Sequence, residues 1–265
     1  MSGAAIRFAD ASVRYPGAPD DAVRNVSVEI ASGELVVLLG PSGCGKSTLL
    51  RTVNRLVALS NGSVFVDERD VAGADAVQLR REIGYAIQAV GLFAHMSVAE
   101  NVAVVPSLLG WPRERIAARV DELLGMVGLA PARYRARRPR ELSGGEAQRV
   151  GVARALAAGP RALLMDEPFG AVDAIVRASL QRELAKIVRG LGTTTIFVTH
   201  DVEEAMRLAD RILVMRDGAI EQAGTPDRLL ETPATPYVAE LLRAGDAVNR
   251  EYLLHARAAM RNGEP

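Results

Sequence analysis

Residues 40–48 read Gly40-Pro41-Ser42-Gly43-Cys44-Gly45-Lys46-Ser47-Thr48, a glycine-rich loop that ends in Lys-Ser-Thr. The apolar run 35–39 before it predicts a buried parallel strand, and Leu49, Leu50 and Val53 after it are spaced like the inner face of a helix. Strand, loop and helix in this order suit phosphate binding, because glycines let backbone N–H groups turn inward and the helix presents its positive N-terminal end. We therefore predict a phosphate-binding loop, in preference to a glycine-rich turn with an incidental lysine.

The side chains of this loop have predicted roles. Lys46 would reach the β- and γ-phosphates of a nucleotide, and the Ser47 hydroxyl would ligate Mg²⁺. The other residues expected to line the phosphates are Gly40, Ser42, Gly43, Cys44, Gly45 and Thr48.

Composition sets the outer limits of the fold. The chain has 265 residues, of which 49% are hydrophobic, enough for one large α/β domain or a core with a smaller lobe. Its 32 basic residues balance 32 acidic ones, so net charge does not favour nucleic acid or an anionic membrane as the main partner.

One cysteine excludes an internal disulfide and fits a reducing compartment. Residues 1–7 lack the apolar segment of a signal peptide, and no run approaches the roughly 18 apolar residues of a spanning helix, so we expect any membrane attachment to require another subunit.

Residues 6–40 alternate between apolar and polar, which predicts short strands. Tyr15 in this region is either an aromatic platform for a nucleotide base or a strand aromatic that packs on the sheet. Packing is the commoner use of a single tyrosine, and composition alone favours it. After the loop and its helix, Asn61-Gly62 predicts a hairpin turn into the strand Ser63–Val66.

Residues 89–158 change character and predict a helical lobe inserted into the sheet domain, with Pro112 at a first helical position and Gly128 as a stop. Within it, Ser143-Gly144-Gly145 opens a helix. A capping serine explains the start of that helix, but not two successive glycines, which each cost up to about 1 kcal/mol inside a helix. The pair therefore suggests close approach to the phosphates of a ligand.

Two adjacent carboxylates, Asp166-Glu167, follow the apolar strand Ala162–Met165. The carboxyl ends of buried strands are where α/β sheets bind ligands. Asp166 is predicted to hold Mg²⁺ through its water shell and Glu167 to act as general base, whereas the structural alternative is that the pair caps the next helix. His200 likewise follows an apolar strand, where it is either functional or a satisfied structural residue. The predicted fold is α/β: a P-loop NTPase core with a mostly parallel sheet, an N-terminal antiparallel β subdomain and an inserted helical subdomain.

Together these residues resemble the ATP-binding subunits of ABC transporters over nearly the whole chain. The matching motifs are Tyr15 as the adenine-stacking aromatic, Gly40–Thr48 as Walker A, Gln88 as the Q-loop, Leu142–Glu146 as the signature, Leu163–Glu167 as Walker B, Gly170–Asp173 as the D-loop and His200 as the switch histidine. Two departures are visible: the signature continues Glu146-Ala147-Gln148 where glutamines are usual, and Val172 replaces the commoner leucine of the D-loop.

This resemblance implies ATP and Mg²⁺ as cofactors. It implies catalytic roles for Lys46, Gln88, Glu167 and His200, a metal site of Ser47, Gln88 and Asp166, and a place for Tyr15 and Asp173 at the nucleotide. It also implies that Ser143, Gly144 and Gly145 contact the γ-phosphate of ATP bound to a second copy of the chain, in an ATP-dependent homodimer. Tyr15 is then expected to stack on adenine, against the packing interpretation.

A narrower resemblance rests on the run Tyr85–Met96, with Glu100-Asn101-Val102 and Leu109-Gly110-Trp111 after it. It looks like bacterial importers of quaternary amines such as glycine betaine, choline or carnitine. This implies an ATPase at the cytoplasmic face of the inner membrane, bound to integral membrane permease subunits, served by a substrate-binding protein and not bound to nucleic acid. Many such proteins carry a C-terminal pair of CBS domains, for which we expect no room in this polypeptide.

The expected organisation is an ABC-type domain over residues 1–245, with a core of 1–88 and 159–225 and a helical subdomain of about 89–158, followed by a polar tail at 246–265. Other classes stay open. The cargo could be another polar solute such as an amino acid. An ATPase of DNA repair would need a long coiled coil, zinc cysteines or a basic face, and a ribosome-associated ATPase would normally carry two such cassettes in one chain.

Overall fold

The structure, a computed structural model, describes residues 3–87, 91–170, 172 and 174–245. The chain forms two compact units. The phosphate-loop unit comprises Ile6–Ile30, Glu34–Ala72 and the chain from Ile196 onward. The helical unit comprises the chain up to Ala5, Ala31–Gly33 and Gly73–Thr195.

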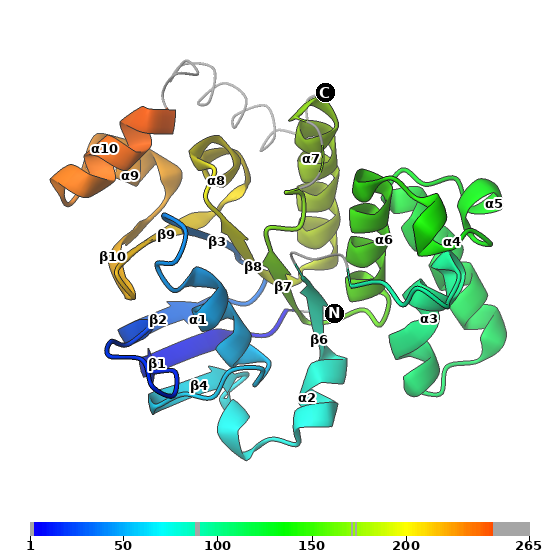
Figure 1. The fold of residues 1–265 in the computed structure, drawn as a ribbon, viewed down its shortest axis with the longest axis horizontal. Coiled ribbons are helices and arrows are strands. Elements are labelled where there is room, and N and C mark those ends of the chain that lie inside the picture. Colours follow the sequence, from blue (N-terminus) through cyan, green and yellow to red (C-terminus); the bar gives the residue numbers. More distant parts are fainter. Residues whose placement is uncertain (1–2, 88–90, 171, 173, 246–265) are drawn as a thin grey trace. The chain divides into compact units, whose positions relative to one another are not determined.

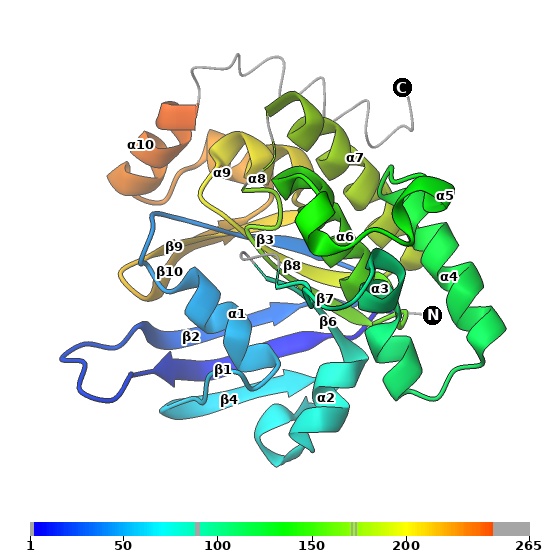
Figure 2. The same cartoon turned by 45° about the vertical axis from the view of Figure 1, so that its right-hand side comes forward.

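An antiparallel sheet forms the first part of the phosphate-loop unit. Its strands are β1 (Ile6–Val13), β2 (Val23–Ile30), β4 (Asn61–Val66) and the short β5 (Arg69–Asp70), in the order β2-β1-β4-β5. Figure 2 shows β1, β2 and β4 side by side. The predicted antiparallel N-terminal subdomain is therefore confirmed.

The hairpin turn predicted at Asn61-Gly62 is wrong. Both residues belong to β4, where Gly62 has a φ of 80° and a Cβ atom on it would come within 2.2 Å of the Asp10 carbonyl oxygen. Glycine is needed there for close approach of β4 to β1, which is the other common use of glycine in a strand. The turn lies at Asp67-Glu68, with φ values of 49° and 61°, the positive pair that a two-residue hairpin loop requires.

The second sheet of this unit contains the strand that leads into the phosphate loop. Within this unit the strand order is β10 (Ala219–Gly224), β9 (Arg211–Arg216), β3 (Leu35–Leu39) and β8 (Thr194–Thr199). Strand β8 belongs to this unit from Ile196 onward. Strand β3 runs parallel to β9 and is buried along its whole length, as its continuous apolar sequence predicts. Strands β9 and β10 form a hairpin, as the Asp-Gly pair between these two apolar runs predicts. The turn residues Asp217 and Gly218 have φ values of 47° and 80°.

The helices of this unit are α1 (Lys46–Val53), the 3₁₀ helix η1 (Val71–Gly73) at its boundary, α8 (Val202–Leu208), α9 (Pro226–Glu231) and α10 (Pro236–Gly245). Helix α1 buries Leu49, Leu50 and Val53 completely, which confirms the inner face predicted from their spacing. Burial of each such leucine contributes about 1.5–3 kcal/mol, so this face fixes α1, and with it the loop that precedes α1.

The helical unit contains a parallel pair of strands, β6 (Ile83–Ala86) and β7 (Ala162–Asp166). Its helices are α2 (Ala76–Glu82), α3 (Val98–Leu108), α4 (Arg113–Met126), α5 (Pro131–Tyr134), the 3₁₀ helix η2 (Pro139–Glu141), α6 (Gly144–Leu156) and α7 (Ala174–Leu191). Helix α6 packs against α3 and α4, as Figure 1 shows. Helix α4 begins at Arg113, with Pro112 as its N-cap and not at the predicted first helical position. The predicted stop at Gly128, which has a φ of 68°, is confirmed.

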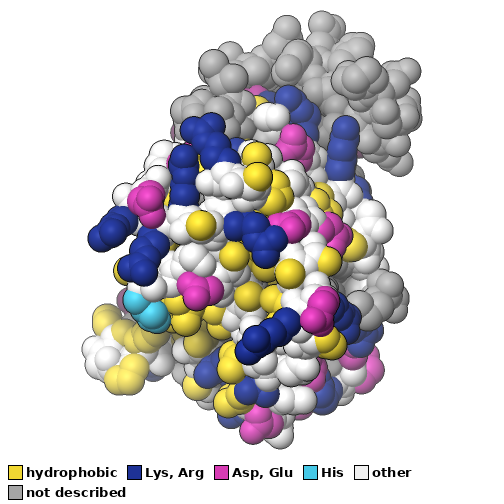
Figure 3. Space-filling view, turned by 90° about the vertical axis from the view of Figure 1, so that its right-hand side faces the viewer, with side chains coloured by type: hydrophobic (Ala, Val, Ile, Leu, Met, Phe, Trp, Pro, Cys, Tyr) yellow, Lys and Arg dark blue, Asp and Glu magenta, His cyan; other side chains and the backbone are white. Residues whose placement is uncertain are grey.

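The predicted helical lobe corresponds to α3–α6, which lie within the larger helical unit. The domain boundaries expected at residues 88, 158 and 225 stay predictions. Figure 3 shows a face on which basic side chains are spread among acidic and hydrophobic ones. Across the residues that the structure describes, no helix has the length and apolar character needed to cross a membrane.

Candidate nucleotide-binding site

The phosphate loop connects β3 to α1, and neighbouring backbone atoms lie close to two of its glycines. A Cβ atom on Gly40 would lie 2.2 Å from the Met215 carbonyl oxygen, and one on Gly45 would lie 2.3 Å from the Ala22 carbonyl oxygen. Gly45 is also the N-cap of α1, with a left-handed φ of 101°. Both glycines are therefore required by backbone close to the loop, independently of any ligand.

The N-terminus of α1 has the electrostatic character of an anion site. Gly45 at the N-cap offers no side chain to the first N–H groups, and the first turn reads Lys46-Ser47-Thr48-Leu49, none of them acidic. The positive end of the helix dipole is consequently not neutralised by its own first turn, and Lys46 adds a full positive charge. This combination favours a phosphate group.

The ammonium group of Lys46 is held within the loop. The side chain is 5% exposed, and its Nζ donates to the carbonyl oxygens of Gly40 and Pro41, both at 2.7 Å, and more weakly to Sγ of Cys44 at 3.8 Å. An ammonium has three donors, and thiol sulfur is a weak acceptor. A phosphate oxygen would therefore compete most easily for the donor that faces Cys44.

Cys44 is buried beside that ammonium. Burial raises the pKa of the Cys44 thiol, and the nearby Lys46 only partly opposes this effect. The thiol is consequently less ionised at neutral pH than a free cysteine, and we expect it to react slowly.

Tyr15 lies in the turn between β1 and β2 and is 42% exposed, so the interpretation as a packed strand aromatic is wrong. Its hydroxyl oxygen lies 3.1 Å from Oγ1 of Thr48 in α1, which places the aromatic ring next to the phosphate-loop helix. Tyr15 also lines an open hollow of about 570 Å³, together with Arg14, Asn25 and Ser60. That volume is within the range of small-molecule sites. The base-stacking role itself stays a proposal.

The signature segment forms a second helix N-terminus, in the helical unit. Ser143 is the N-cap of α6: its Oγ accepts from the Glu146 N–H at 3.3 Å, and Glu146 Oε2 accepts from the Ser143 N–H at 2.8 Å. The predicted capping role of Ser143 is thus confirmed, and both Ser143 and Gly144 are exposed. A Cβ atom on Gly145 would lie 3.5 Å from Val172 Cγ2, an ordinary contact, so packing against the described residues does not explain this glycine.

The predicted carboxylate pair, Asp166 and Glu167, lies at the end of a strand where the backbone is strained. Asp166 is the last residue of β7 and is fully buried, and Glu167 after it has a φ of 46°. A left-handed backbone is uncommon for a non-glycine residue and is often held at functional sites. Helix α7 begins only at Ala174, so the alternative in which the pair caps the next helix is wrong.

The remaining predicted residues divide between the described and undescribed parts of the chain. His200 directly follows β8 and is exposed, while its neighbour Asp201 caps α8 by accepting from the Glu204 N–H at 3.1 Å. Gln88 and Asp173 lie outside the described residues, and their roles stay predictions. The phosphate-loop unit thus holds Tyr15, Walker A and His200, and the helical unit holds the signature and Walker B.

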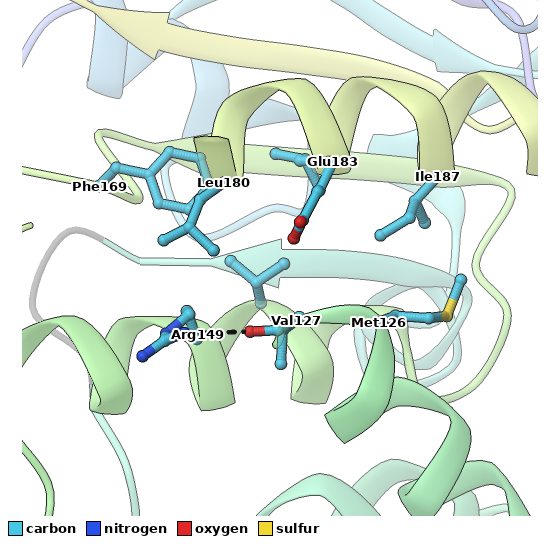
Figure 4. A pocket seen from close by; sticks show the side chains of 9 residues that line it. Met126, Val127, Arg149, Phe169, Leu180, Glu183 and Ile187 are labelled. Atoms are coloured by element: carbon cyan, nitrogen blue, oxygen red, sulfur yellow. Dashed lines mark hydrogen bonds between the residues drawn. The ribbon is translucent and has the colours of Figure 1, made fainter. Parts of the chain in front are cut away.

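An apolar pocket in the helical unit is too small for a ligand. Figure 4 shows Leu180 and Ile187 of α7 on one side and Val127 and Arg149 on the other. Arg149 Nη1 donates to the Val127 carbonyl oxygen at 3.5 Å across its edge. The pocket holds about 10 Å³, room for no more than one water molecule. It is a packing defect between helices and not a substrate site.

Sequence reasoning missed one residue at the signature, Tyr134. Its hydroxyl donates to Oε1 of Glu146 at 2.5 Å, so it touches the capping box of α6 from α5. The Ser-x-x-Glu spacing of residues 143–146 could have predicted the role of Glu146. No spacing rule would have found its partner.

A buried strand, a glycine-constrained loop with a lysine and an open helix N-terminus define a P-loop nucleotide-binding protein of the α/β class. A family model described as "ABC transporter" matches residues 23–170, more than half of the chain. The chain belongs to the ABC transporter family.

Two curated relatives and one solved structure illustrate this membership. The glycine betaine/carnitine/choline transport ATP-binding protein OpuCA of Bacillus subtilis is 48% identical over 89% of this chain, and the match covers 60% of OpuCA. The osmoprotectant import ATP-binding protein OsmV of Salmonella typhimurium is 46% identical over 92% of this chain and 67% of OsmV. The dimeric ATP-binding cassette MJ0796 bound to ADP and phosphate has a TM-score of 0.75 and 31% identity, covering 83% of this chain and 98% of MJ0796. The present chain thus spans about 60% of the length of OpuCA.

Proposed function

We propose that this chain is the ATP-hydrolysing motor subunit of an ABC importer. One observation carries the proposal: a single chain presents both a phosphate loop at the open N-terminus of α1 and an exposed, serine-capped signature at the N-terminus of α6. Two copies could therefore hold ATP between the phosphate loop of one and the signature of the other. The MJ0796 cassette, a dimer with bound ADP and phosphate, supports this arrangement in a relative.

Within this proposal each site residue has a chemical role. Lys46 and the N–H groups of the loop bind the β- and γ-phosphates, and Tyr15 stacks on the base. Ser47, Gln88 and Asp166 would hold Mg²⁺, which when bound neutralises developing phosphate charge. Glu167 accepts a proton from the attacking water, and His200 contacts the γ-phosphate. Asp173 is proposed at the same nucleotide by resemblance only.

The proposed partners are permease subunits that anchor the chain at the cytoplasmic face of the membrane. Exposed hydrophobic side chains support a protein partner, since Phe93, Leu108 and Leu109 of the helical unit are 43%, 57% and 41% exposed. Affinity capture of the tagged full chain from gently solubilised membranes tests this. An integral membrane protein should co-purify in stoichiometric amount. Co-purification of nucleic acid or ribosomes without a membrane protein would overturn the importer in favour of a soluble ABC ATPase.

The proposed cargo is a quaternary-amine osmoprotectant, delivered by a separate binding protein. The run Tyr85–Met96 and the names of OpuCA and OsmV support this class. Another polar solute is the second candidate, because the ATPase subunit does not itself bind the cargo. Uptake of labelled glycine betaine and of a labelled amino acid, compared in cells with and without the gene, separates the two. Loss of amino-acid uptake alone would favour the second candidate.

A further inference from the structure

We propose that Tyr134 is a positioning residue for the signature, acting through Glu146. The inference rests on the proposed function, in which Ser143 and its neighbours contact a nucleotide. It adds Tyr134, a residue outside the signature, as a determinant of how Ser143 is oriented towards the nucleotide. The relevant atoms are the Tyr134 hydroxyl, the two carboxylate oxygens of Glu146 and the backbone N–H and hydroxyl of Ser143.

The Glu146 carboxylate divides its two oxygens between two donors. Oε1 accepts from the Tyr134 hydroxyl at 2.5 Å, and Oε2 accepts from the Ser143 N–H at 2.8 Å. With one oxygen fixed by Tyr134, rotation of the carboxylate is restricted and the other oxygen stays aimed at Ser143. The Glu146 N–H in turn donates to Ser143 Oγ at 3.3 Å. That bond uses a lone pair of the serine oxygen, which leaves the hydroxyl hydrogen able to donate to a phosphate oxygen.

Tyr134 can serve as a fixed anchor because it is itself immobilised. It is 8% exposed at the end of α5, and the guanidinium of Arg137 lies 4.7 Å from its ring centroid. A cation over an aromatic face adds to the packing that holds the ring. The hydroxyl is thereby presented to Glu146 from a buried, constrained side chain.

The segment that carries Tyr134 also caps a second helix of the same unit. The carbonyl oxygens of Arg135 and Arg137 accept from the N–H groups of Ala99 and Val98, at 3.0 and 2.8 Å, in the first turn of α3. The N-termini of α3 and α6 are therefore both tied to residues 134–137. A shift of this segment would alter the signature serine through the Tyr134–Glu146 bond.

A carboxylate at position 146 suits this geometry better than an amide. A carboxylate accepts on both oxygens, whereas a glutamine has one acceptor oxygen and an NH₂ group that would face one of the two donors. A glutamine oxygen could still accept from the Ser143 N–H, while its NH₂ group would have to donate to the Tyr134 hydroxyl oxygen. Glu146→Gln therefore keeps size and replaces the charge-assisted bond from Tyr134 by a weaker neutral one. Tyr134→Phe removes only the hydroxyl and keeps the ring beneath Arg137.

The test compares four full-length proteins with the wild type: Tyr134→Phe, Glu146→Gln, the double variant and Glu100→Gln. The last is a matched control, because Ser97 and Glu100 form the same capping box at α3, with N–H to carboxylate and N–H to hydroxyl bonds of 2.6 and 3.2 Å. Steady-state ATPase kinetics, ATP binding by the isolated subunit and amide hydrogen exchange at α6 are measured for each.

We expect Tyr134→Phe to lower kcat roughly tenfold, the size expected for a lost hydrogen bond to a charged group, with little change in ATP affinity. Amides of the first turn of α6 should exchange faster, and the loss in the double variant should be smaller than the sum of the two single losses. Wild-type kcat and exchange in Tyr134→Phe, additive losses in the double variant, or an equal loss of kcat in Glu100→Gln would each overturn the inference. If the wild type itself hydrolyses no ATP, the proposed function fails, and the exchange measurement still decides whether Tyr134 orders the signature.

Discussion

The hydroxyl oxygen of Tyr15 lies 3.1 Å from Oγ1 of Thr48, joining the β1–β2 turn to the helix that follows the phosphate loop. These residues are 33 positions apart in sequence, yet one hydrogen bond fixes the distance between an exposed aromatic ring and the phosphate loop. A nucleotide that places its phosphates on the loop would find the ring at a defined position for its base.

The two functions of Tyr15, stacking and the bond to Thr48, should separate by mutation. Tyr15→Phe keeps the ring and loses the bond, so ATP affinity should fall only about two- to fivefold. Tyr15→Ala removes the ring as well, and affinity should fall by about tenfold or more. Fluorescence titration of the isolated subunit measures both. An alanine variant that binds ATP like the wild type would exclude base stacking by Tyr15.

Cys44 should be a slow, nucleotide-protected target of thiol reagents. Because burial raises the pKa of its thiol, the reactive thiolate is scarce at neutral pH, and the rate of modification should increase as pH rises towards that pKa. Bound Mg·ATP should protect, since Lys46, which contacts Cys44 Sγ, would then also contact phosphate.

Mass spectrometry and ATPase assays on the same samples test this, and Cys44→Ala serves as the unmodified control because the chain has no other cysteine. Full modification with ATPase activity intact would show that the thiol does not lie in the path of the phosphates.

Ser143→Arg should leave ATP binding by the isolated subunit nearly unchanged and abolish hydrolysis. The bulky cation would sit at the exposed N-cap of α6 and block the approach of a partner's nucleotide. Photolabelling with an ATP analogue, beside a turnover assay, measures the two effects. Ser97→Arg, at the equivalent N-cap of α3, controls for the loss of a helix cap. Normal hydrolysis by Ser143→Arg would exclude action of the signature on a partner's ATP.

The Glu146 carboxylate should make stability depend on acid pH. Hydrogen bonds from Tyr134 and Ser143 lower the pKa of Glu146 from its ordinary 4.5 in the folded protein. A depressed folded pKa means that the carboxylate stabilises the fold fully above its unfolded pKa and loses this effect as pH falls through the folded value. Tyr134→Phe and Glu146→Gln should therefore flatten the stability profile as pH falls below the ordinary Glu146 pKa of 4.5.

Urea unfolding at a series of pH values gives these profiles. Glu100, whose pKa is lowered mainly by its bond with the Ser97 backbone, provides the comparison. Profiles of Tyr134→Phe and wild type that coincide in acid would show that the tyrosine does not stabilise the ionised Glu146.

Sequence patterns predicted those features of the fold that are determined by residues close together in the sequence. The loop context, the Asp217-Gly218 turn, the stop of α4 at Gly128 and the cap at Ser143 all depend on neighbouring residues, and all are confirmed. Asn61-Gly62 misled because a positive φ serves a close strand approach as well as a turn.

Such patterns could not predict contacts between elements that are far apart in the sequence. The exposure of Tyr15 and its bond to Thr48 depend on how β1 and β2 meet α1. The bond from Tyr134 to Glu146 joins α5 to α6 and follows no helical or strand spacing. The strained φ of Glu167 likewise has no signature in composition.

Glu167 is proposed as the general base of an ATP sandwich between two copies of the chain. Glu167→Gln keeps size and hydrogen-bonding capacity but removes the proton acceptor, so turnover should fall by about 10²- to 10⁴-fold while nucleotide affinity changes little. Because ATP binding is linked to dimerisation, this variant should accumulate as an ATP-bound dimer, whereas Lys46→Ala, which loses phosphate contacts, should remain monomeric.

Size-exclusion chromatography of Glu167→Gln with and without saturating Mg·ATP, alongside its hydrolysis rate, decides between a sandwich and a subunit that acts alone. We expect a shift from monomer to dimer on addition of Mg·ATP, with hydrolysis nearly abolished and with no shift for Lys46→Ala. A Glu167→Gln protein that elutes as a monomer at saturating ATP and hydrolyses at the wild-type rate would contradict both the assignment of the base and the sandwich.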